Sequence, residues 1–322
     1  MSDRACVNWV VAFLMISVMV PVPARAQGLI FRTQTELVNL NVTVVGSNAQ
    51  PVAGLTEDQF EIFEDGVRQD VQFFDPGDLP LDVIILLDTS ASMGSALGLV
   101  QAAATRFAEA LGPEDRASVM GISNGLRILQ PLSHDMEAVA AAIRQTRPAG
   151  RTPLYASIYT ALRELARTRD AYETPRRQAM VVLSDGQDTA SGFGFDELID
   201  TVRRLGVPIY TIAPRPPQAI GEQREMVFGE TTREQDFELR RLAAETGGRA
   251  FFPVVLQELA GVYQNIANEL AHQYSIGYES SSSRTDGGFR RIGLRVAAPG
   301  VKWRTRAGYI VIADALTGAD LR

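Results

Sequence analysis

Residues 82–92 read DVIILLDTSAS, and this stretch decides the fold of the central part of the chain. The run at 83–87 is short and continuously apolar, which is typical of a strand buried on both faces of a parallel sheet. Similar short apolar runs occur at 117–122, 126–130, 179–183, 207–213 and 249–252. The stretch therefore predicts one strand of an α/β sheet, followed directly by a polar loop.

Segments with helical periodicity lie between these apolar runs. In the first of them, apolar residues recur at positions 100, 103, 104, 107 and 111. The others cover about 135–146, 154–168, 195–205, 236–246 and 256–272. Strands that alternate with helices predict a doubly wound, mostly parallel sheet with helices on both faces. Asn124-Gly125, between two apolar runs, predicts one antiparallel hairpin at the edge of that sheet.

Strand patterns without helices flank the α/β region. ELVNLNVTVV (36–45) reads as a strand, and FEIFEDGVRQDVQFF (60–74) gives two alternating runs around Asp65-Gly66, a hairpin signal. After residue 272 the runs YSIGYES, RRIGLRV and WRTRAGYIV follow. Each group is too short to form a good core alone. We therefore expect both to pair in one small β-sandwich, into which the α/β domain is inserted.

The first 26 residues have the features of a secretory signal peptide. Arg4 precedes an apolar run from Val7 to Val20, and Ala24-Arg25-Ala26 supplies the small residues of a cleavage site. The run is shorter than the ~20 residues that span a bilayer, and no later run is long enough. The only cysteine, Cys6, lies inside this segment. We expect an exported protein, periplasmic or extracellular, with no membrane span after cleavage.

Composition bounds the classes of function. The chain has 322 residues, 46% hydrophobic, a net charge of −7 and only two histidines. An acidic balance argues against a nucleic-acid partner, because phosphate binding needs clustered cations.

Together these patterns divide the chain into parts. We expect five parts, at 1–26 (signal), 27–78 (sandwich strands), 80–272 (α/β domain), 273–312 (sandwich strands) and 313–322 (tail).

Five oxygen-bearing residues follow the ends of predicted strands or open a helix. Asp88, Ser90 and Ser92 come directly after the strand at 82–87, and Asp185 follows the strand at 179–183. Thr152 opens the helix at 154–168. In open α/β sheets, ligands bind at the carboxyl ends of the strands. Two carboxylates and three hydroxyls converging there suit Mg²⁺ or Mn²⁺, with waters completing the coordination.

At these residues the chain resembles the von Willebrand factor type A domain and its metal-ion-dependent adhesion site, whose pattern is Asp-x-Ser-x-Ser, then Thr, then Asp. The resemblance covers about residues 80–272. The flanks, including Val52-Ala53-Gly54-Leu55 and Arg304 to Tyr309, resemble secreted bacterial VWFA-related proteins first named from Acidobacteria. Asp-x-Ser-x-Ser alone is a weak pattern. It becomes specific because Thr152 and Asp185 follow it in the expected order.

The resemblance implies a non-enzymatic binding and adhesion module. Ser90, Ser92 and Thr152 would contact a divalent cation, Mg²⁺ first with Mn²⁺ or Ca²⁺ as alternatives, and Asp88 and Asp185 would act directly or through water. Two carboxylates only just neutralise the ion, so an open position would attract an Asp or Glu carboxylate of a partner protein. Two positions depart from the family. Arg151 replaces a common glycine, and Ala156 replaces a common Asp.

Several alternatives stay open at the level of the sequence. The two serines could cap a helix and Asp185 could be a turn residue, in a structural domain that uses no metal. Arg151 could pair with an acidic ligand or repel the metal. Residues 215–234 read as a long loop, in which Met226 and Phe228 are either partner contacts or packed anchors.

A serine hydrolase is the rival from another class. Residues 121–125, GISNG, match G-x-S-x-G, and Ser123, Asp185 and His272 follow the chain order of an α/β-hydrolase triad. That elbow must lead into a helix. Here a strand is expected next, so the pattern favours a hairpin turn.

Overall fold

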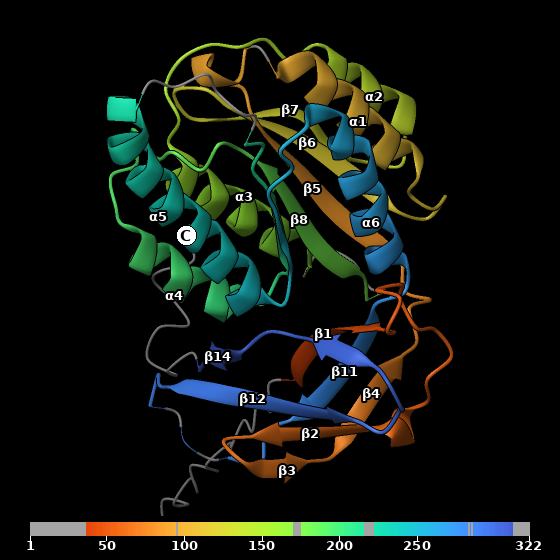
Figure 1. The fold of residues 1–322 in the computed structure, drawn as a ribbon. Helices are drawn as coiled ribbons and strands as arrows, with labels where there is room; N and C mark the ends of the chain where they lie inside the picture. The colour runs from red at the N-terminus through yellow and green to blue at the C-terminus, as the bar shows by residue number, and fades with distance from the viewer. Residues whose placement is uncertain are drawn as a thin grey trace, which may run out of the picture. The chain divides into compact units, whose positions relative to one another are not determined.

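A six-stranded mixed sheet forms the centre of the computed structural model, which describes residues 37–94, 96–169, 175–215, 222–282, 284 and 286–311. The strand order is β10-β9-β8-β5-β6-β7 (Figure 1). All neighbours are parallel except β6 and β7. The strands are β5 (Leu81–Asp88), β6 (Arg116–Ile122), β7 (Leu126–Ser133), β8 (Arg177–Leu183), β9 (Ile209–Ile212) and β10 (Ala250–Phe251). The predicted α/β fold and its antiparallel edge hairpin are confirmed.

The pleat of β5 explains why its sequence is continuously apolar from Val83 to Leu87, between Asp82 and Asp88. Every residue of the strand is buried. Val83, Ile85 and Leu87 join one hydrophobic cluster, whereas Ile84 and Leu86 join a second. Successive side chains of a strand point to opposite faces. The sheet therefore has a core on each side, and both cores pass through β5.

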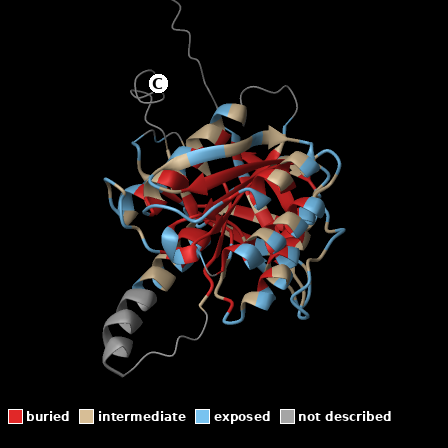
Figure 2. Ribbon diagram, turned by 90° about the horizontal axis from the view of Figure 1, so that it is seen from above, coloured by how far each residue is buried: buried red, intermediate tan, exposed pale blue. Residues whose placement is uncertain are grey.

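In the part of the chain that the structure describes, six helices supply the other halves of these two cores. They are α1 (Leu97–Glu109), α2 (Met136–Arg144), α3 (Leu154–Arg169), α4 (Phe195–Leu205), α5 (Glu222–Thr246) and α6 (Leu259–Ala271). Helices α1, α2 and α6 contribute to the first cluster, and α3, α4 and α5 to the second. Figure 2 shows the buried strands at the centre and the helices with their exposed faces outward. Short 3₁₀ turns occur at Glu57–Gln59, Ala91–Met93 and Leu256–Glu258.

The flanking strands form two four-stranded sheets. Their orders are β13-β1-β11-β4 and β14-β12-β2-β3, and each sheet contains strands from before and after the α/β region. One hydrophobic cluster includes residues of both sheets, among them Leu40, Ile62, Tyr278 and Leu294. The strands are β1 (Leu37–Val45), β2 (Phe60–Glu64), β3 (Val67–Gln69), β4 (Val71–Asp75), β11 (Tyr274–Glu279), β12 (Phe289–Val296), β13 (Lys302–Arg304) and β14 (Gly308–Ile310).

Two predicted segments differ from the structure. The run expected as one strand after Asp65-Gly66 is two strands, because β3 pairs with β2 while β4 pairs with β11 of the other sheet. The long loop expected at 215–234 is wrong from Glu222 onward, where α5 already begins. Alternation alone does not show which sheet a strand joins, and the polar start of α5 has no apolar periodicity to reveal it.

The sheet order places a topological switch point between β5 and β8. From β5 the chain goes to β6 and β7 on one side, and then to β8, β9 and β10 on the other. In open α/β sheets a ligand site is expected at the carboxyl ends of the two strands at such a point. Within the described ranges, no helix is long and apolar enough to cross a membrane. The expected signal peptide and the tail beyond 312 lie outside those ranges.

Candidate functional site

Asp88 is the last residue of β5 and is fully buried. Its Oδ1 accepts a hydrogen bond from the Ser90 backbone N–H at 2.8 Å, and its Oδ2 accepts one from the Ser184 hydroxyl at 2.7 Å. Burial raises the pKa of the Asp88 carboxyl, against the effect of these hydrogen bonds, and the charge of Asp185 raises it further. The carboxylate makes no ion pair with any residue that the structure describes.

Ser90 and Ser92 lie in the loop after β5, at the 3₁₀ turn Ala91–Met93. Their hydroxyl oxygens are 3.0 Å apart, and Ser90 is buried while Ser92 is exposed. Neither the turn nor α1 has a capping hydrogen bond from a side chain at its N-cap. The hydrogen bonds therefore give no support to the alternative that these serines cap a helix.

Thr152 is buried in the loop before α3. Its backbone N–H donates to the Thr189 hydroxyl at 3.0 Å, and its carbonyl accepts from the Thr189 N–H at 2.9 Å. Three residues earlier, the Ala149 N–H donates to the Thr89 carbonyl at 2.7 Å. These bonds join the loop before α3 to the loops after β8 and β5. The loops that carry the predicted site residues thus meet at the carboxyl ends of β5 and β8.

Asp185 follows β8 and is half-buried, and its Oδ1 accepts from the Gln187 N–H at 3.0 Å. Its charge acts on Asp88, which places the two carboxylates in the same electrostatic neighbourhood. Asp188, which the sequence analysis did not single out, accepts from the Tyr155 N–H at 2.9 Å at the start of α3. Ser184, directly after β8, was also missed.

Arg151 is exposed, and its guanidinium donates to the Thr189 carbonyl. Its backbone N–H donates to Asn124 Oδ1 at 2.9 Å. These two bonds join Arg151 to the β6–β7 turn and to the loop after β8. Met226 and Phe228 lie in α5, in the part of this helix whose side chains the structure does not describe.

The donor chemistry of this site is compatible with a hard divalent cation. Carboxylate and hydroxyl oxygens are the donors that such ions prefer. Among the described residues, no group of three or more His, Cys, Asp and Glu side chains could hold a metal. The candidate set has two carboxylates, so hydroxyls would have to supply its remaining protein ligands. A buried carboxylate without a cation beside it is costly, and a bound cation would remove that cost.

The residues of the hydrolase alternative do not meet. The Ser123 hydroxyl donates to the Ala149 carbonyl at 2.6 Å, and β7 rather than a helix follows the Asn124-Gly125 turn. His272 ends α6, beside Leu270, whose carbonyl accepts from Arg177 at the start of β8. Asp185 lies beyond the other end of β8, about 20 Å along the strand. G-x-S-x-G here is a hairpin turn.

Comparison with known proteins shows what the central domain is similar to. Residues 83–187 match the family model of the von Willebrand factor type A domain. A "UPF0353 protein" of Mycolicibacterium vanbaalenii is 29% identical over 233 residues, 67% of this chain and 66% of the relative. One from Mycobacterium marinum is 27% identical over 231 residues, 66% of each chain. The chain thus spans slightly less than two thirds of the length of the curated relatives it matches.

A solved structure shares the fold. It is described as "von Willebrand factor type A from Catenulispora acidiphila", with a TM-score of 0.50 and 12% identity over 88% of this chain and 76% of that one. At that identity the likeness concerns the fold alone. The matched residues 83–187 run from β5 to just beyond Asp185 and so contain all five predicted metal ligands. Over residues 83–187 the chain therefore matches the von Willebrand factor type A domain.

Proposed function

We propose that this chain is a non-enzymatic protein-binding module that binds a divalent cation, Mg²⁺ first, at the carboxyl ends of β5 and β8. The observation that carries the proposal is the Asp88 carboxylate. It is fully buried, makes no ion pair with a described residue, and lies where three oxygen-rich loops are joined. Buried charges in proteins are generally paired or coordinate metals.

In this proposal Ser90, Ser92 and Thr152 hold the cation through their hydroxyls, and Asp88 and Asp185 hold it directly or through water. When bound, the ion supplies a Lewis-acidic position for a carboxylate. Two carboxylates only balance its charge, so an acidic side chain of a partner protein is attracted rather than repelled. The exposure of Ser92 gives such a partner access to the site.

The rest of the chain presents this site. We propose that the two flanking sheets form a β-sandwich from residues 27–78 and 273–312, with the type A domain at 80–272 inserted between them. Pairing of β1 with β11 and of β2 with β12 supports this arrangement, because each pair joins the two chain segments. We also propose export through the signal peptide, with the module acting in the periplasm or outside the cell.

One observation favours a second candidate, a structural type A domain without metal-dependent binding, whose ion, if any, is not used. Ser90 N–H and Ser184 Oγ–H already donate to the two oxygens of Asp88. Hydrogen bonds to a carboxylate stabilise its charged form without an ion. The two candidates differ in whether Mg²⁺ binds and whether partner binding depends on it.

Calorimetric titration of the full chain with MgCl₂ separates them. We expect one Mg²⁺ per chain, with binding strongly weakened by Thr152→Val. The control Thr201→Val removes a hydroxyl that donates to the Glu197 carbonyl on α4 and should leave binding unchanged. Absence of Mg²⁺ binding to the wild-type chain, or equal binding by both variants, would overturn the metal site.

Partner binding is then tested with immobilised wild-type chain and envelope extract. A bound protein should be released by chelator, restored by Mg²⁺, and lost with Asp88→Asn. If Mg²⁺ binds but the partner stays bound in chelator, the structural candidate replaces the proposed bridge.

A further inference from the structure

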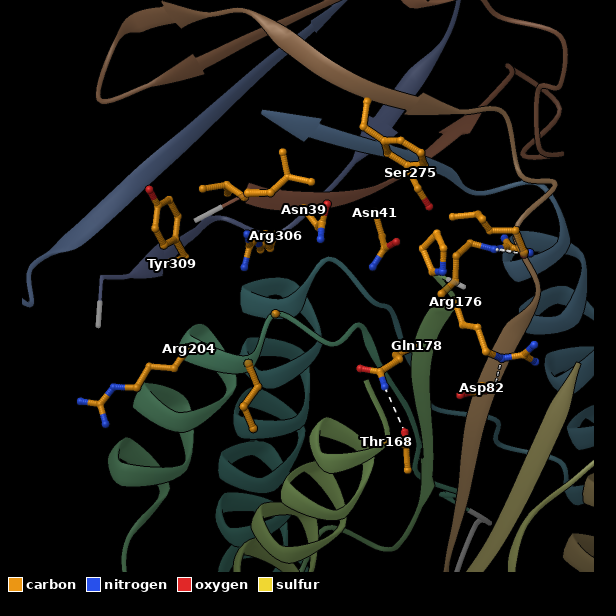
Figure 3. A pocket seen from close by; sticks show the side chains of 18 of the residues that line it. Asn39, Asn41, Asp82, Thr168, Arg176, Gln178, Arg204, Ser275, Arg306 and Tyr309 are labelled. Atoms are coloured by element: carbon orange, nitrogen blue, oxygen red, sulfur yellow. Dashed lines mark hydrogen bonds and ion pairs between the residues drawn. The ribbon is translucent and has the colours of Figure 1, made fainter. Parts of the chain in front are cut away.

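A cavity of about 200 Å³ lies at the opposite end of the α/β domain from the candidate metal site. It opens where the amino ends of β5 and β8 face β1 and β11 (Figure 3). Asp82 lines the cavity at the start of β5, while Asp88 ends the same strand. They are six positions apart along the strand, about 20 Å. The cavity is therefore a separate place in the molecule.

The lining of the cavity holds more arginines than carboxylates, although the charges of Asp75, Asp78 and Asp115 also act on one of them, Arg177. Its described lining holds four arginines and one carboxylate, namely Arg176, Arg177, Arg204, Arg306 and Asp82. The carboxylate is already neutralised, because Asp82 accepts hydrogen bonds from both Arg116 and Arg176. The chain as a whole carries a net charge of −7. A local excess of arginines in an acidic protein favours an anion at this place.

Neutral hydrogen-bonding groups face the same space. The side chains of Asn39 and Asn41 extend from β1 into the cavity (Figure 3), and their amide groups make no hydrogen bond with described residues. Ser275 of β11 also lines it. This residue is only 8% exposed, and its buried hydroxyl has no hydrogen-bond partner in the part of the chain described.

An unpartnered buried hydroxyl costs about 1–3 kcal/mol, so such groups are rare unless a bound molecule satisfies them. The amides and the hydroxyl can all donate, as can the arginines. Apolar side chains, Phe73 and Leu79 among them, complete the lining. The site thus combines donors for an oxyanion with a surface for a short hydrocarbon part.

We propose that this cavity binds a small organic oxyanion, a carboxylate or a phosphate ester, with Asn41 and Ser275 donating to it and the arginine-rich wall balancing its charge. The cavity is smaller than the roughly 300 Å³ at which typical ligand pockets begin, which indicates a ligand of few atoms. The site does not depend on the proposed metal function.

Titration calorimetry of the full chain tests the site, with sodium succinate and glycerol phosphate as probes in chelator at constant ionic strength. We expect one-to-one binding of at least one probe, and the probe that binds more tightly identifies the head group. Asn41→Asp should weaken it at least ~10-fold, since a carboxylate would face the bound anion. Asn48→Asp, the same charge change on the exposed β1–β2 connection, should have no such effect.

A second variant guards against a folding artefact. Ser275→Ala introduces no charge and should weaken the probe severalfold, with a thermal midpoint at or above that of wild type because a costly buried hydroxyl is gone. The proposal is overturned if neither probe binds the wild-type chain, or if Asn41→Asp and Ser275→Ala both bind as tightly as Asn48→Asp. Because chelator is present throughout, these outcomes do not depend on Mg²⁺.

Discussion

The Asp88 carboxylate is a charged group whose burial should lower the stability of the fold when no cation is bound. It is fully buried, and burial raises its pKa. In chelator at neutral pH we expect Asp88→Asn to raise the free energy of unfolding by about 1–3 kcal/mol, because the amide keeps the shape without the buried charge. The same variant should lose any stabilisation by Mg²⁺. Chemical denaturation with and without Mg²⁺ measures both effects.

The pH dependence of that difference gives an independent check. A folded-state pKa raised above the unfolded value means that the folded protein binds the proton more tightly, so metal-free wild type gains stability relative to Asp88→Asn as the pH falls. The difference in the free energy of unfolding between Asp88→Asn and wild type should therefore become smaller toward acidic pH. Asp70→Asn changes an exposed position and should have the same free energy of unfolding as wild type at neutral pH. A difference that widens on acidification would contradict a raised pKa.

At the residue scale, the candidate metal donors could be predicted from the sequence, but the residues that hydrogen-bond to them could not. Asp88, Ser90 and Thr152 could be placed because strand ends and helix starts are readable from apolar patterning. Ser184 could not, because a serine after a strand is common and only the structure shows its hydroxyl bonded to Asp88. Thr189 was missed for the same reason, since its bonds to Thr152 join positions far apart in sequence.

At the scale of elements, one glycine controls how the loop before α3 meets the β6–β7 turn. Gly150 has φ +77°, and a Cβ there would lie 2.6 Å from the Asn124 side chain. Gly150→Ala should therefore lower the free energy of unfolding by about 1–3 kcal/mol and weaken Mg²⁺ binding, because Thr152 follows two residues later. Gly192→Ala, where a Cβ meets nothing within 4 Å, is the matched control for denaturation and calorimetry. Equal effects of the two variants would refute this role.

The elements that could be predicted are those whose own residues are apolar at the right spacing. β5 and β8 are buried at every position, and each contains a continuous apolar run, at 83–87 and 179–183. The start of α5 at Glu222 was missed because its first residues are mostly polar. The separation of β3 from β4 was missed because it depends on partners, β2 for one and β11 for the other, that lie in different parts of the chain.

At the scale of the whole molecule, ion pairs of the buried Glu269 join the α/β domain to the strands that follow it. Glu269 of α6 is 4% exposed and forms ion pairs with Arg304 of β13 and, at 3.2 Å, with Arg249 before β10. Arg304 also donates to the Gly247 carbonyl at 3.0 Å. These contacts fix the return of the chain from the α/β domain to the sheet that β13 shares with β1.

We expect Glu269→Gln to lower the free energy of unfolding by about 1–3 kcal/mol, because it leaves two arginines without their carboxylate while keeping the size of the side chain. The control is Glu164→Gln, which removes an exposed pair with Arg167 on α3 and should cost less than ~0.5 kcal/mol. Denaturation monitored by tryptophan fluorescence reports on this junction, because Trp303 adjoins Arg304 in β13. A loss for Glu269→Gln no larger than for Glu164→Gln would show that packing of the apolar clusters, rather than this charge network, holds the two regions together.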